Sequence, residues 1–234
     1  MALHLKQRLA RHVRGWIRGP RQDKSHWEMQ YKNGRWSYLH QLQELGHYSV
    51  IAGYVKYLKH NASILDLGCG DGILAERLDA NSFSEYVGVD LSDVAISHAQ
   101  TRGYPRASFE SADIERYTPR RSFDVIVLNE SLYYLSDPVG TLARYRQYLK
   151  PRGIFIVSMY LPPRAPLWRR IARRYPALDE TRVRNREGAE WVCRVFAPQR
   201  VADARRPDEA GNDAPRPLSS LTGEKADSPD APWT

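Results

Sequence analysis

Short apolar runs alternate with stretches of helical periodicity through the middle of the chain. The runs have the length of buried strands, and the stretches between them repeat their apolar positions every three to four residues, as one face of a helix does. The predicted strands cover residues 63–67, 86–90, 123–129 and 154–159, and the predicted helices cover residues 73–78, 94–101 and 139–149. This alternation predicts an α/β fold in which a parallel sheet carries helices on both faces.

A basic helical segment and two strand-like stretches follow the alternating region. They cover residues 167–175, 180–184 and 190–196. Beyond residue 197 prolines recur and few large apolar side chains remain, so this stretch cannot bury enough surface to offset its ordering entropy. We expect residues 63–197 to form the core domain and residues 198–234 to be a disordered tail.

Two helical segments precede the alternating region. Residues 25–62, which we call the preamble, are rich in aromatic side chains and have apolar positions at helical spacing. The predicted core-facing stripe of the preamble consists of Tyr38, Leu42, Leu45, Tyr48, Ile51, Tyr54, Val55 and Leu58. Within residues 1–24, the stretch 3–18 has the pattern of a basic amphipathic helix, so we expect a helical N-terminal extension.

The composition is that of one large globular domain with extensions. The chain has 234 residues, of which 42% are hydrophobic, and its mean hydropathy is −0.59. No apolar run approaches the roughly 20 residues that cross a bilayer, so we predict no transmembrane segment. Two cysteines, Cys69 and Cys193, are too few for a disulfide framework or a four-thiolate zinc site. These features favour a cytoplasmic protein.

The net charge of +8 is unevenly distributed. Residues 203–234 hold four basic and seven acidic side chains, so the other 202 residues carry +11. Such a surface suits nucleic acid, an anionic membrane or acidic substrates, and the total does not choose among them. A weak contact with an anionic membrane surface stays open for residues 3–18, whose apolar face can enter an interface.

The clearest motif follows the first predicted strand. Residues 64–73 read I-L-D-L-G-C-G-D-G-I, with glycines at alternate positions. Such a backbone allows a ligand to approach the carboxyl edge of the sheet closely. The dinucleotide pattern G-x-G-x-x-G requires a glycine where Ile73 stands, and the sequence has no P-loop pattern. Sites for NAD and for nucleoside triphosphates are therefore disfavoured.

Acidic residues follow the next two strands. Asp90 ends the strand over residues 86–90, where its carboxylate can accept hydrogen bonds from both hydroxyls of a ribose. Asp113 follows residues 108–110 and can accept a hydrogen bond from an adenine amino group. Each acid alone is equally well explained as a loop or N-cap residue. Their position at successive strand ends beside the glycine loop indicates a ligand site.

Five motifs in this order resemble those of class I S-adenosylmethionine (SAM)-dependent methyltransferases. They are D-x-G-x-G-x-G from Asp66, G-x-D from Gly88, D-I from Asp113, F-D-V-I-V from Phe123 and L-K-P-x-G from Leu149. The resemblance covers about residues 27–196. It implies a Rossmann-like, mostly parallel sheet of seven strands, with residues 180–184 and 190–196 as its antiparallel edge.

The resemblance also implies SAM as the cofactor. By this resemblance, Gly68 and Gly70 approach the methionine part, and Asp66 helps to hold its amino group. Asp90 takes the ribose hydroxyls, Leu91 packs on the adenine and Asp113 binds the adenine amine. The complete predicted cofactor set is Asp66, Gly68, Cys69, Gly70, Gly72, Asp90, Leu91, Asp113, Ile114 and Asn129. Methyl transfer of this kind requires no metal.

The acceptor site is predicted at the end of the strand over residues 123–129. An in-line displacement requires the nucleophile to be held about 3 Å from the methyl group. A protonated acceptor must also lose a proton. Glu130 is the first candidate for this base or for a group that binds an amine, and Tyr133 and His47 are further candidate catalytic residues.

The absence of two known motifs narrows the range of possible methyl acceptors. Residues 129–132 read N-E-S-L in place of the Asn/Asp-Pro-Pro-aromatic tetrad of amino-methylating DNA enzymes, and neither cysteine is placed as a pyrimidine nucleophile. Residues 130–135 resemble small-molecule methyltransferases, including nodulation-type N-methyltransferases that act on amino sugars. We predict transfer to an O or N atom of a small polar metabolite, a sugar or natural-product precursor, with no specific nucleic-acid partner. The alternatives are an RNA methyltransferase and a non-catalytic SAM-fold binding module that docks through residues 3–18.

Overall fold

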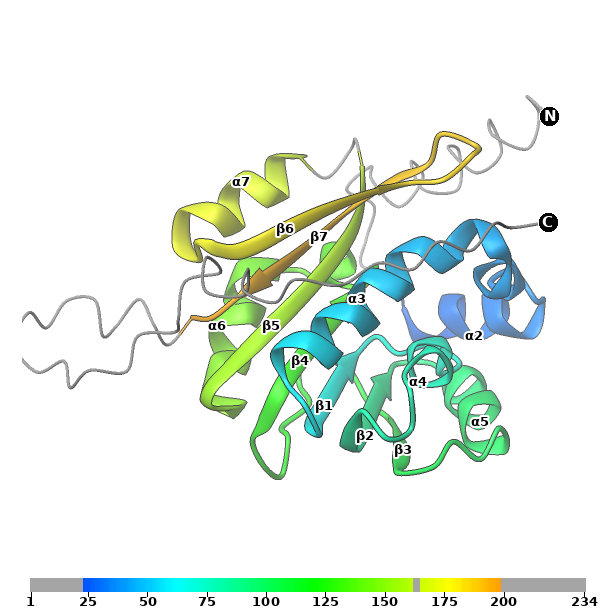
Figure 1. Ribbon diagram of the computed structural model, residues 1–234. Coiled ribbons are helices and arrows are strands. Elements are labelled where there is room, and N and C mark those ends of the chain that lie inside the picture. The colour runs from blue at the N-terminus through cyan, green and yellow to red at the C-terminus, as the bar shows by residue number, and fades with distance from the viewer. Residues whose placement is uncertain (1–22, 162–164, 199–234) are drawn as a thin grey trace, which may run out of the picture.

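The structure, a computed structural model, describes residues 23–161 and 165–198. One sheet of seven strands runs through these residues (Figure 1). Its strands are β1 (Ala62–Leu67), β2 (Phe83–Asp90), β3 (Ala107–Ser111), β4 (Phe123–Asn129), β5 (Leu149–Leu161), β6 (Ala177–Arg184) and β7 (Glu190–Phe196).

The strand order is β3-β2-β1-β4-β5-β7-β6. Strands β1 to β5 pair in parallel, whereas β7 pairs antiparallel with both β5 and β6. The predicted α/β class, the mostly parallel sheet and its antiparallel edge are therefore confirmed. Because β1, β2 and β4 run in the same direction, the residues that follow them meet at one carboxyl edge of the sheet.

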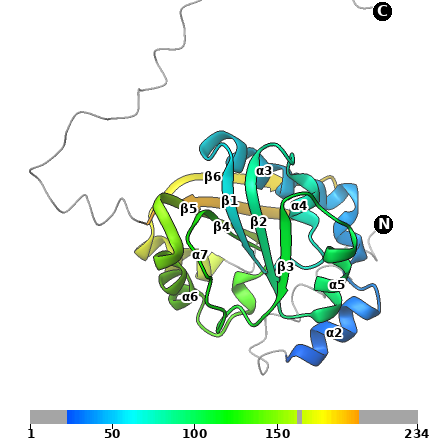
Figure 2. The same ribbon diagram turned by 90° about the horizontal axis from the view of Figure 1, so that it is seen from below.

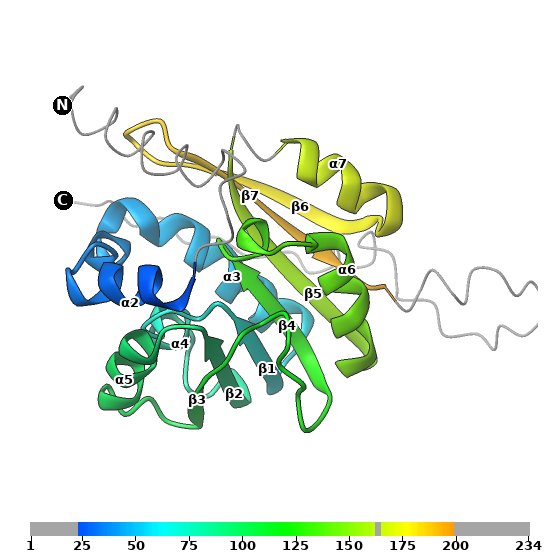
Figure 3. The same cartoon turned by 180° about the vertical axis from the view of Figure 1, so that it is seen from behind.

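Side chains of the central strands alternate between two hydrophobic cores, one on each face of the sheet. Ile64 enters one core and its neighbour Leu65 enters the other, as the two-residue period of a strand requires. Helices α3 (Leu45–Leu58), α4 (Ile73–Arg77) and α5 (Asp93–Thr101) pack into the first core, and α6 (Pro138–Tyr145) and α7 (Ala165–Arg174) into the second. Helix α3 lies in front of the sheet in Figure 1, and α6 lies in front of it in Figure 3.

The preamble contributes residues at the carboxyl edge of the sheet. It contains α2 (Lys24–Lys32), two short 3-10 turns η1 (Ser37–His40) and η2 (Leu42–Glu44), and then α3. Figure 2 shows α2 beside α5 at the β3 end of the sheet. Lys24 Nζ lies 2.7 Å from Asp93 Oδ1, and Glu28 accepts a 2.6 Å hydrogen bond from the backbone N–H of Asp93. These contacts attach α2 to the N-terminus of α5.

The predicted preamble stripe is wrong at two positions, Leu42 and Leu58. Leu42 is 79% exposed, whereas Glu44, which the apolar pattern ignores, is buried. Leu42 stands nine positions before Ile51, half a turn out of phase with the buried face of α3. Glu44 precedes Tyr48, Ile51 and Val55 by four, seven and eleven positions and therefore lies in phase with that face. From Leu45 onward the prediction is confirmed at Tyr48, Ile51 and Val55, which enter the first core, and wrong at Leu58, the last residue of α3, which is 37% exposed.

Several predictions fall on residues outside the described ranges. The amphipathic helix over residues 3–18 lies there, as does the predicted tail from residue 199 onward. Among the described residues, no helix is both long enough and apolar enough to cross a membrane.

Candidate active site

A cavity lies at the carboxyl edge of the sheet, between the preamble and the ends of β1, β2 and β4. Most of the predicted cofactor residues line it, namely Asp66, Gly68, Cys69, Gly70, Asp90, Leu91, Asp113, Ile114 and Asn129. Gly72 does not line it but stands at the start of α4, in the left-handed conformation with φ +83°. The ends of β1, β2, β3 and β4 therefore bring residues from distant parts of the sequence to one cavity.

The glycine loop after β1 is held against the end of β2. The backbone N–H groups of Gly68 and Cys69 donate to the carbonyl of Val89, at 2.7 and 3.1 Å. Gly68 has φ +85°, and a Cβ atom built on it overlaps the Cβ of Ser131. Only glycine satisfies both constraints, so the loop turns sharply beneath the cavity.

Asp90 organises the loop as well as facing the cavity. Its Oδ2 accepts a 3.0 Å hydrogen bond from the N–H of Gly70, and its Oδ1 accepts a 2.9 Å bond from the N–H of Ser92. Burial raises the pKa of Asp90, while these backbone donors oppose the rise. Asp113 lines the cavity too, and its Oδ1 accepts a 3.0 Å hydrogen bond from the N–H of Glu115. Both acids thus fix their own loops, and both also line the cavity.

Asp66 is buried at the floor of the cavity. The hydroxyl of Tyr86 donates to its Oδ2, and its Oδ1 has no hydrogen-bond partner within the described residues. Burial raises the pKa of Asp66 to about 7. Trp36 also lines the cavity, and its indole Nε1 is a buried donor without a partner among the described residues. One buried acceptor and one buried donor suit the zwitterionic amino-acid end of a ligand such as SAM.

Aromatic side chains of the preamble cover the glycine loop. Trp27, Tyr31, Trp36 and Tyr38 all line the cavity. Tyr31 reaches the loop itself, because a Cβ atom built on Gly70 would lie 2.6 Å from the Tyr31 hydroxyl oxygen. The cover is therefore in direct contact with the predicted cofactor loop.

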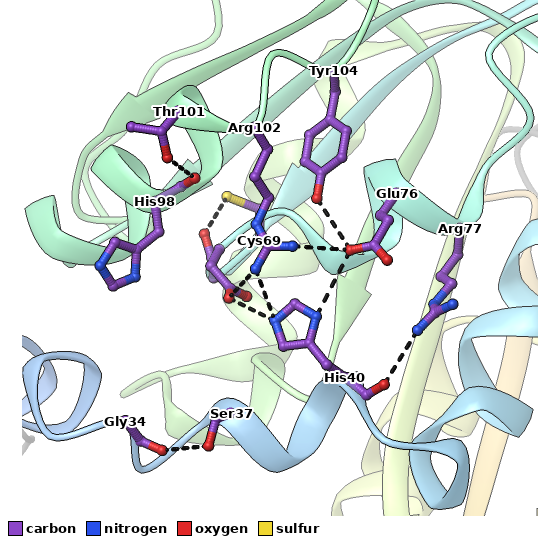
Figure 4. Close-up of polar contacts among 12 residues, drawn as sticks. Gly34, Ser37, His40, Cys69, Glu76, Arg77, His98, Thr101, Arg102 and Tyr104 are labelled. Carbon is purple, nitrogen blue, oxygen red and sulfur yellow. Dashed lines mark hydrogen bonds and ion pairs between the residues drawn. The ribbon is translucent and has the colours of Figure 1, made fainter.

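A polar network connects this cover to the core domain (Figure 4). His40 Nε2 lies 2.8 Å from Asp71 Oδ2, and Arg102 Nη2 lies 3.3 Å from the same oxygen. Arg102 Nη1 also lies 3.1 Å from Glu76 Oε2, which accepts a 3.2 Å hydrogen bond from the hydroxyl of Tyr104. The η1 turn is thus joined through His40 to the glycine loop and α4.

Glu130 and Tyr133 line the cavity next to the end of β4. The hydroxyl of Tyr133 donates a 2.8 Å hydrogen bond to Glu130 Oε2. Glu130 has φ +55°, a left-handed conformation that non-glycine residues adopt rarely and that often marks functional positions. A carboxylate held in this way can accept a proton or bind a cation.

His47 does not line the cavity. It is fully buried behind the wall, where its ring stacks on Trp191 at a centroid distance of 4.9 Å. Its Nδ1 lies 3.2 Å from Asn129 Oδ1, and its Nε2 lies 3.3 Å from Glu44 Oε2. Burial lowers the pKa of His47 to about 4. His47 therefore contacts Asn129 and Glu44, two residues that do line the cavity.

Glu44, Asp71 and Trp191 are among the cavity residues that the sequence analysis did not predict. Glu44 lies in the preamble, is 2% exposed and lines the cavity. Glu44 precedes Tyr48, Ile51 and Val55 by four, seven and eleven positions, so helical spacing places it on the same face as these buried residues. The predicted stripe did not include it because only apolar positions were used to define the stripe.

The chain matches a known protein family over most of its described residues. The model of a family described as "Methyltransferase domain" matches residues 38–197. The chain belongs to this methyltransferase family. The matched region contains the glycine loop, the acids at the strand ends and β4 to β7. The predicted resemblance to methyltransferases is thus confirmed at the level of the family.

Curated relatives of this methyltransferase resemble it over part of their length. A malonyl-[acyl-carrier protein] O-methyltransferase of Halalkalibacterium halodurans is 33% identical over 107 residues, covering 43% of this chain and 40% of the relative. A ubiquinone biosynthesis O-methyltransferase of Nitrosococcus oceani is 33% identical over 133 residues, covering 52% of this chain and 56% of the relative. The match thus spans about half of these relatives.

A solved structure supports the fold of the methyltransferase. The N-methyltransferase NodS of Bradyrhizobium japonicum, in complex with S-adenosyl-L-homocysteine (SAH), superposes with a TM-score of 0.61. The superposition covers 74% of this chain and 98% of NodS, at 17% sequence identity. At that identity the likeness establishes the Rossmann-like methyltransferase fold and nothing about the acceptor.

Proposed function

We propose that this methyltransferase transfers a methyl group from SAM to an O or N atom of a small polar metabolite, such as a sugar or natural-product precursor. The observation that carries the proposal is the aromatic cover over the glycine loop, formed by residues of α2 and η1. A cavity lined by these aromatic side chains suits a compact acceptor, because binding sites for small molecules are concave and largely lined by apolar and aromatic side chains.

The proposed cofactor contacts follow the geometry of the carboxyl edge. Gly68 and Gly70 offer backbone at the methionine part, and the Oδ1 atom of Asp66 accepts from its amino group. Asp90 takes the ribose hydroxyls, and Asp113 the adenine amine. Leu91, Ile114, Cys69 and Asn129 complete the walls as the remaining lining residues of this set. SAM supplies an electrophilic methyl group on a sulfonium.

Glu130 is the proposed base or acceptor-binding group. It lies beside the end of β4, and Tyr133 fixes one of its oxygens at 2.8 Å. His47 holds Asn129 and Glu44 in place and is proposed as a positioning residue. Catalysis then consists mainly of holding the acceptor in line with the methyl group, with proton removal at Glu130.

The relatives do not fix the acceptor. One is named for malonyl-[acyl-carrier protein] and another for ubiquinone biosynthesis, and NodS is named an N-methyltransferase. These names span different acceptors, and each match leaves part of a chain uncovered. The proposal of a small acceptor therefore rests on the cavity and its cover.

A cytoplasmic location is part of the proposal. Both cysteines, Cys69 and Cys193, are buried and free, which suits a reducing compartment. Contact of residues 3–18 with an anionic membrane stays a prediction, because those residues lie outside the described ranges.

The experiment that tests the proposal offers the full-length enzyme two acceptor pools. Isotopically labelled SAM is incubated with the enzyme and either a small-molecule ultrafiltrate of a cell extract or total RNA, and the label is followed by mass spectrometry. We expect labelled product in the ultrafiltrate and none in RNA. Label in RNA at a competitive rate would establish the RNA methyltransferase instead. Binding of SAM with no label in either pool would establish the non-catalytic module.

A further inference from the structure

The charge of the cavity wall contrasts with the charge of the protein. The chain carries a net charge of +8, yet none of the described residues that line the cavity is Lys, Arg or His. Six lining side chains are acidic, namely Glu44, Asp66, Asp71, Asp90, Asp113 and Glu130. Such a wall disfavours an anionic ligand, since like charges repel strongly in a site of low dielectric constant.

Four of the six acids have roles that do not concern the acceptor. Asp71 is paired with His40 and Arg102 of the network described above. Asp66, Asp90 and Asp113 stand at the proposed cofactor contacts. The remaining two, Glu44 and Glu130, lie on the side of the cavity formed by η2 and the end of β4.

Glu44 and Glu130 are connected through buried groups. Glu44 lies 3.3 Å from Nε2 of His47, whose other ring nitrogen contacts Asn129, the neighbour of Glu130. Burial lowers the pKa of His47 and raises that of Tyr48, and the negative charge of Glu130 opposes the first shift and adds to the second, so Glu130 acts on both residues. Both carboxylates therefore act on the same part of the cavity.

Aromatic side chains also line this part of the cavity. Tyr133 and Tyr134 are in contact at a centroid distance of 4.4 Å, and Trp27 meets Tyr134 edge to face at 4.9 Å. All three line the cavity. Aromatic faces attract cations, and the attraction grows when the cation is removed from water.

We infer that the acceptor is a primary or secondary amine, which enters the cavity as an ammonium ion beside Glu130 and Glu44. This inference rests on the proposed function and specifies its substrate class. The ammonium transfers a proton to the Glu130 carboxylate. The freed nitrogen lone pair then forms a bond to the methyl carbon while the sulfur–carbon bond breaks and its electron pair stays on sulfur. The products are the methylated ammonium and SAH, and Glu130 releases its proton to solvent.

Chemical blocking of the acceptor pool tests the substrate class. One portion of the small-molecule ultrafiltrate is N-acetylated before incubation with labelled SAM and the full-length enzyme. A second portion has its carboxyl groups amidated, and a third is untreated. We expect label on nitrogen, assigned by fragmentation in tandem mass spectrometry, in the untreated and amidated pools and its loss from the acetylated pool.

The possible results separate the inference from the proposed function. Label that survives N-acetylation, on an ester or ether oxygen, overturns the amine inference and leaves small-molecule methylation standing. Absence of label from every small molecule, with transfer to RNA or with SAM binding alone, overturns the proposed function itself.

Glu130→Gln tests the assigned base with Glu85→Gln as the matched control. Glu85 lies in the first half of β2, away from the carboxyl edge, and does not line the cavity. We expect Glu130→Gln to lower the rate of nitrogen labelling about 100-fold or more, the lower end for loss of a general base, with unchanged SAM affinity. Glu85→Gln is expected to match the wild type. Full activity of Glu130→Gln would remove Glu130 from the role of base.

Discussion

Replacement of Asp66 by Asn is expected to stabilise the cofactor-free enzyme at pH 8 and at the same time to weaken SAM binding. Burial raises the pKa of Asp66 from its usual 3.8 to about 7. Between these values the folded protein binds the proton more tightly than the unfolded chain, so stability falls as the pH rises from about 4 to 7. Above pH 7 the buried carboxylate is charged and its full cost remains. Asn removes that charge, and its carbonyl can still accept from Tyr86.

The same substitution takes an acceptor away from the cofactor. Oδ1 of Asp66 is the atom proposed to receive the amino group of SAM, and a hydrogen bond to a charged group contributes about 1.5–3 kcal/mol. We expect Asp66→Asn to bind SAM about tenfold or more weakly. Its melting temperature at pH 8 should rise by several degrees, and the gain should vanish near pH 4. A variant less stable than wild type at both pH values would contradict the assignment of a costly buried charge.

Gly68→Ala is expected to cause the largest loss of stability among single-methyl changes in the cofactor loop. Gly68 has φ +85°, which costs an L-residue roughly 1–2 kcal/mol, and the new methyl group would overlap Ser131. Overpacking of a rigid site adds about 1–3 kcal/mol. The free energy of unfolding should therefore fall by about 2–4 kcal/mol in urea denaturation, with SAM binding lost as the loop moves.

Gly53→Ala supplies the control for the added methyl group. Gly53 lies within α3, has no atom within 4 Å of a built Cβ and does not have a positive φ. Alanine there should stabilise the protein by up to about 1 kcal/mol, since it favours the helix and reduces the entropy of the unfolded chain. If Gly68→Ala proved as stable as Gly53→Ala, the crowded loop geometry would be incorrect.

Local sequence patterns were sufficient to predict the sheet and the edge at which the cavity lies. Apolar runs such as residues 123–129 predicted strands because their length and flanks identify buried strands without long-range information. The glycine loop and Asp90 were recognisable because their spacing is set by one strand–turn–helix unit. Motif resemblance added the antiparallel edge, which periodicity alone does not reveal.

The acceptor side was less accessible to prediction because it depends on contacts between distant segments. His47 is buried behind Trp191 and Asn129, which lie 144 and 82 positions further along the chain. Glu44 lies in phase with the buried residues of α3, but a pattern defined by apolar positions does not include a glutamate. The charge of the cavity wall likewise emerges only when six acids from separate elements are brought together.

Calorimetric titration of SAM into wild-type enzyme and Asp90→Ala tests the central claim, that the cofactor lies at the carboxyl edge with its ribose on Asp90. Asp90 lines the cavity and also accepts hydrogen bonds from the N–H groups of Gly70 and Ser92. We expect one SAM per wild-type chain and binding weaker by roughly 1.5–3 kcal/mol in Asp90→Ala, with Asp90→Asn in between. NAD should not bind. Equal SAM affinity in wild type and Asp90→Ala would contradict the placement of the cofactor.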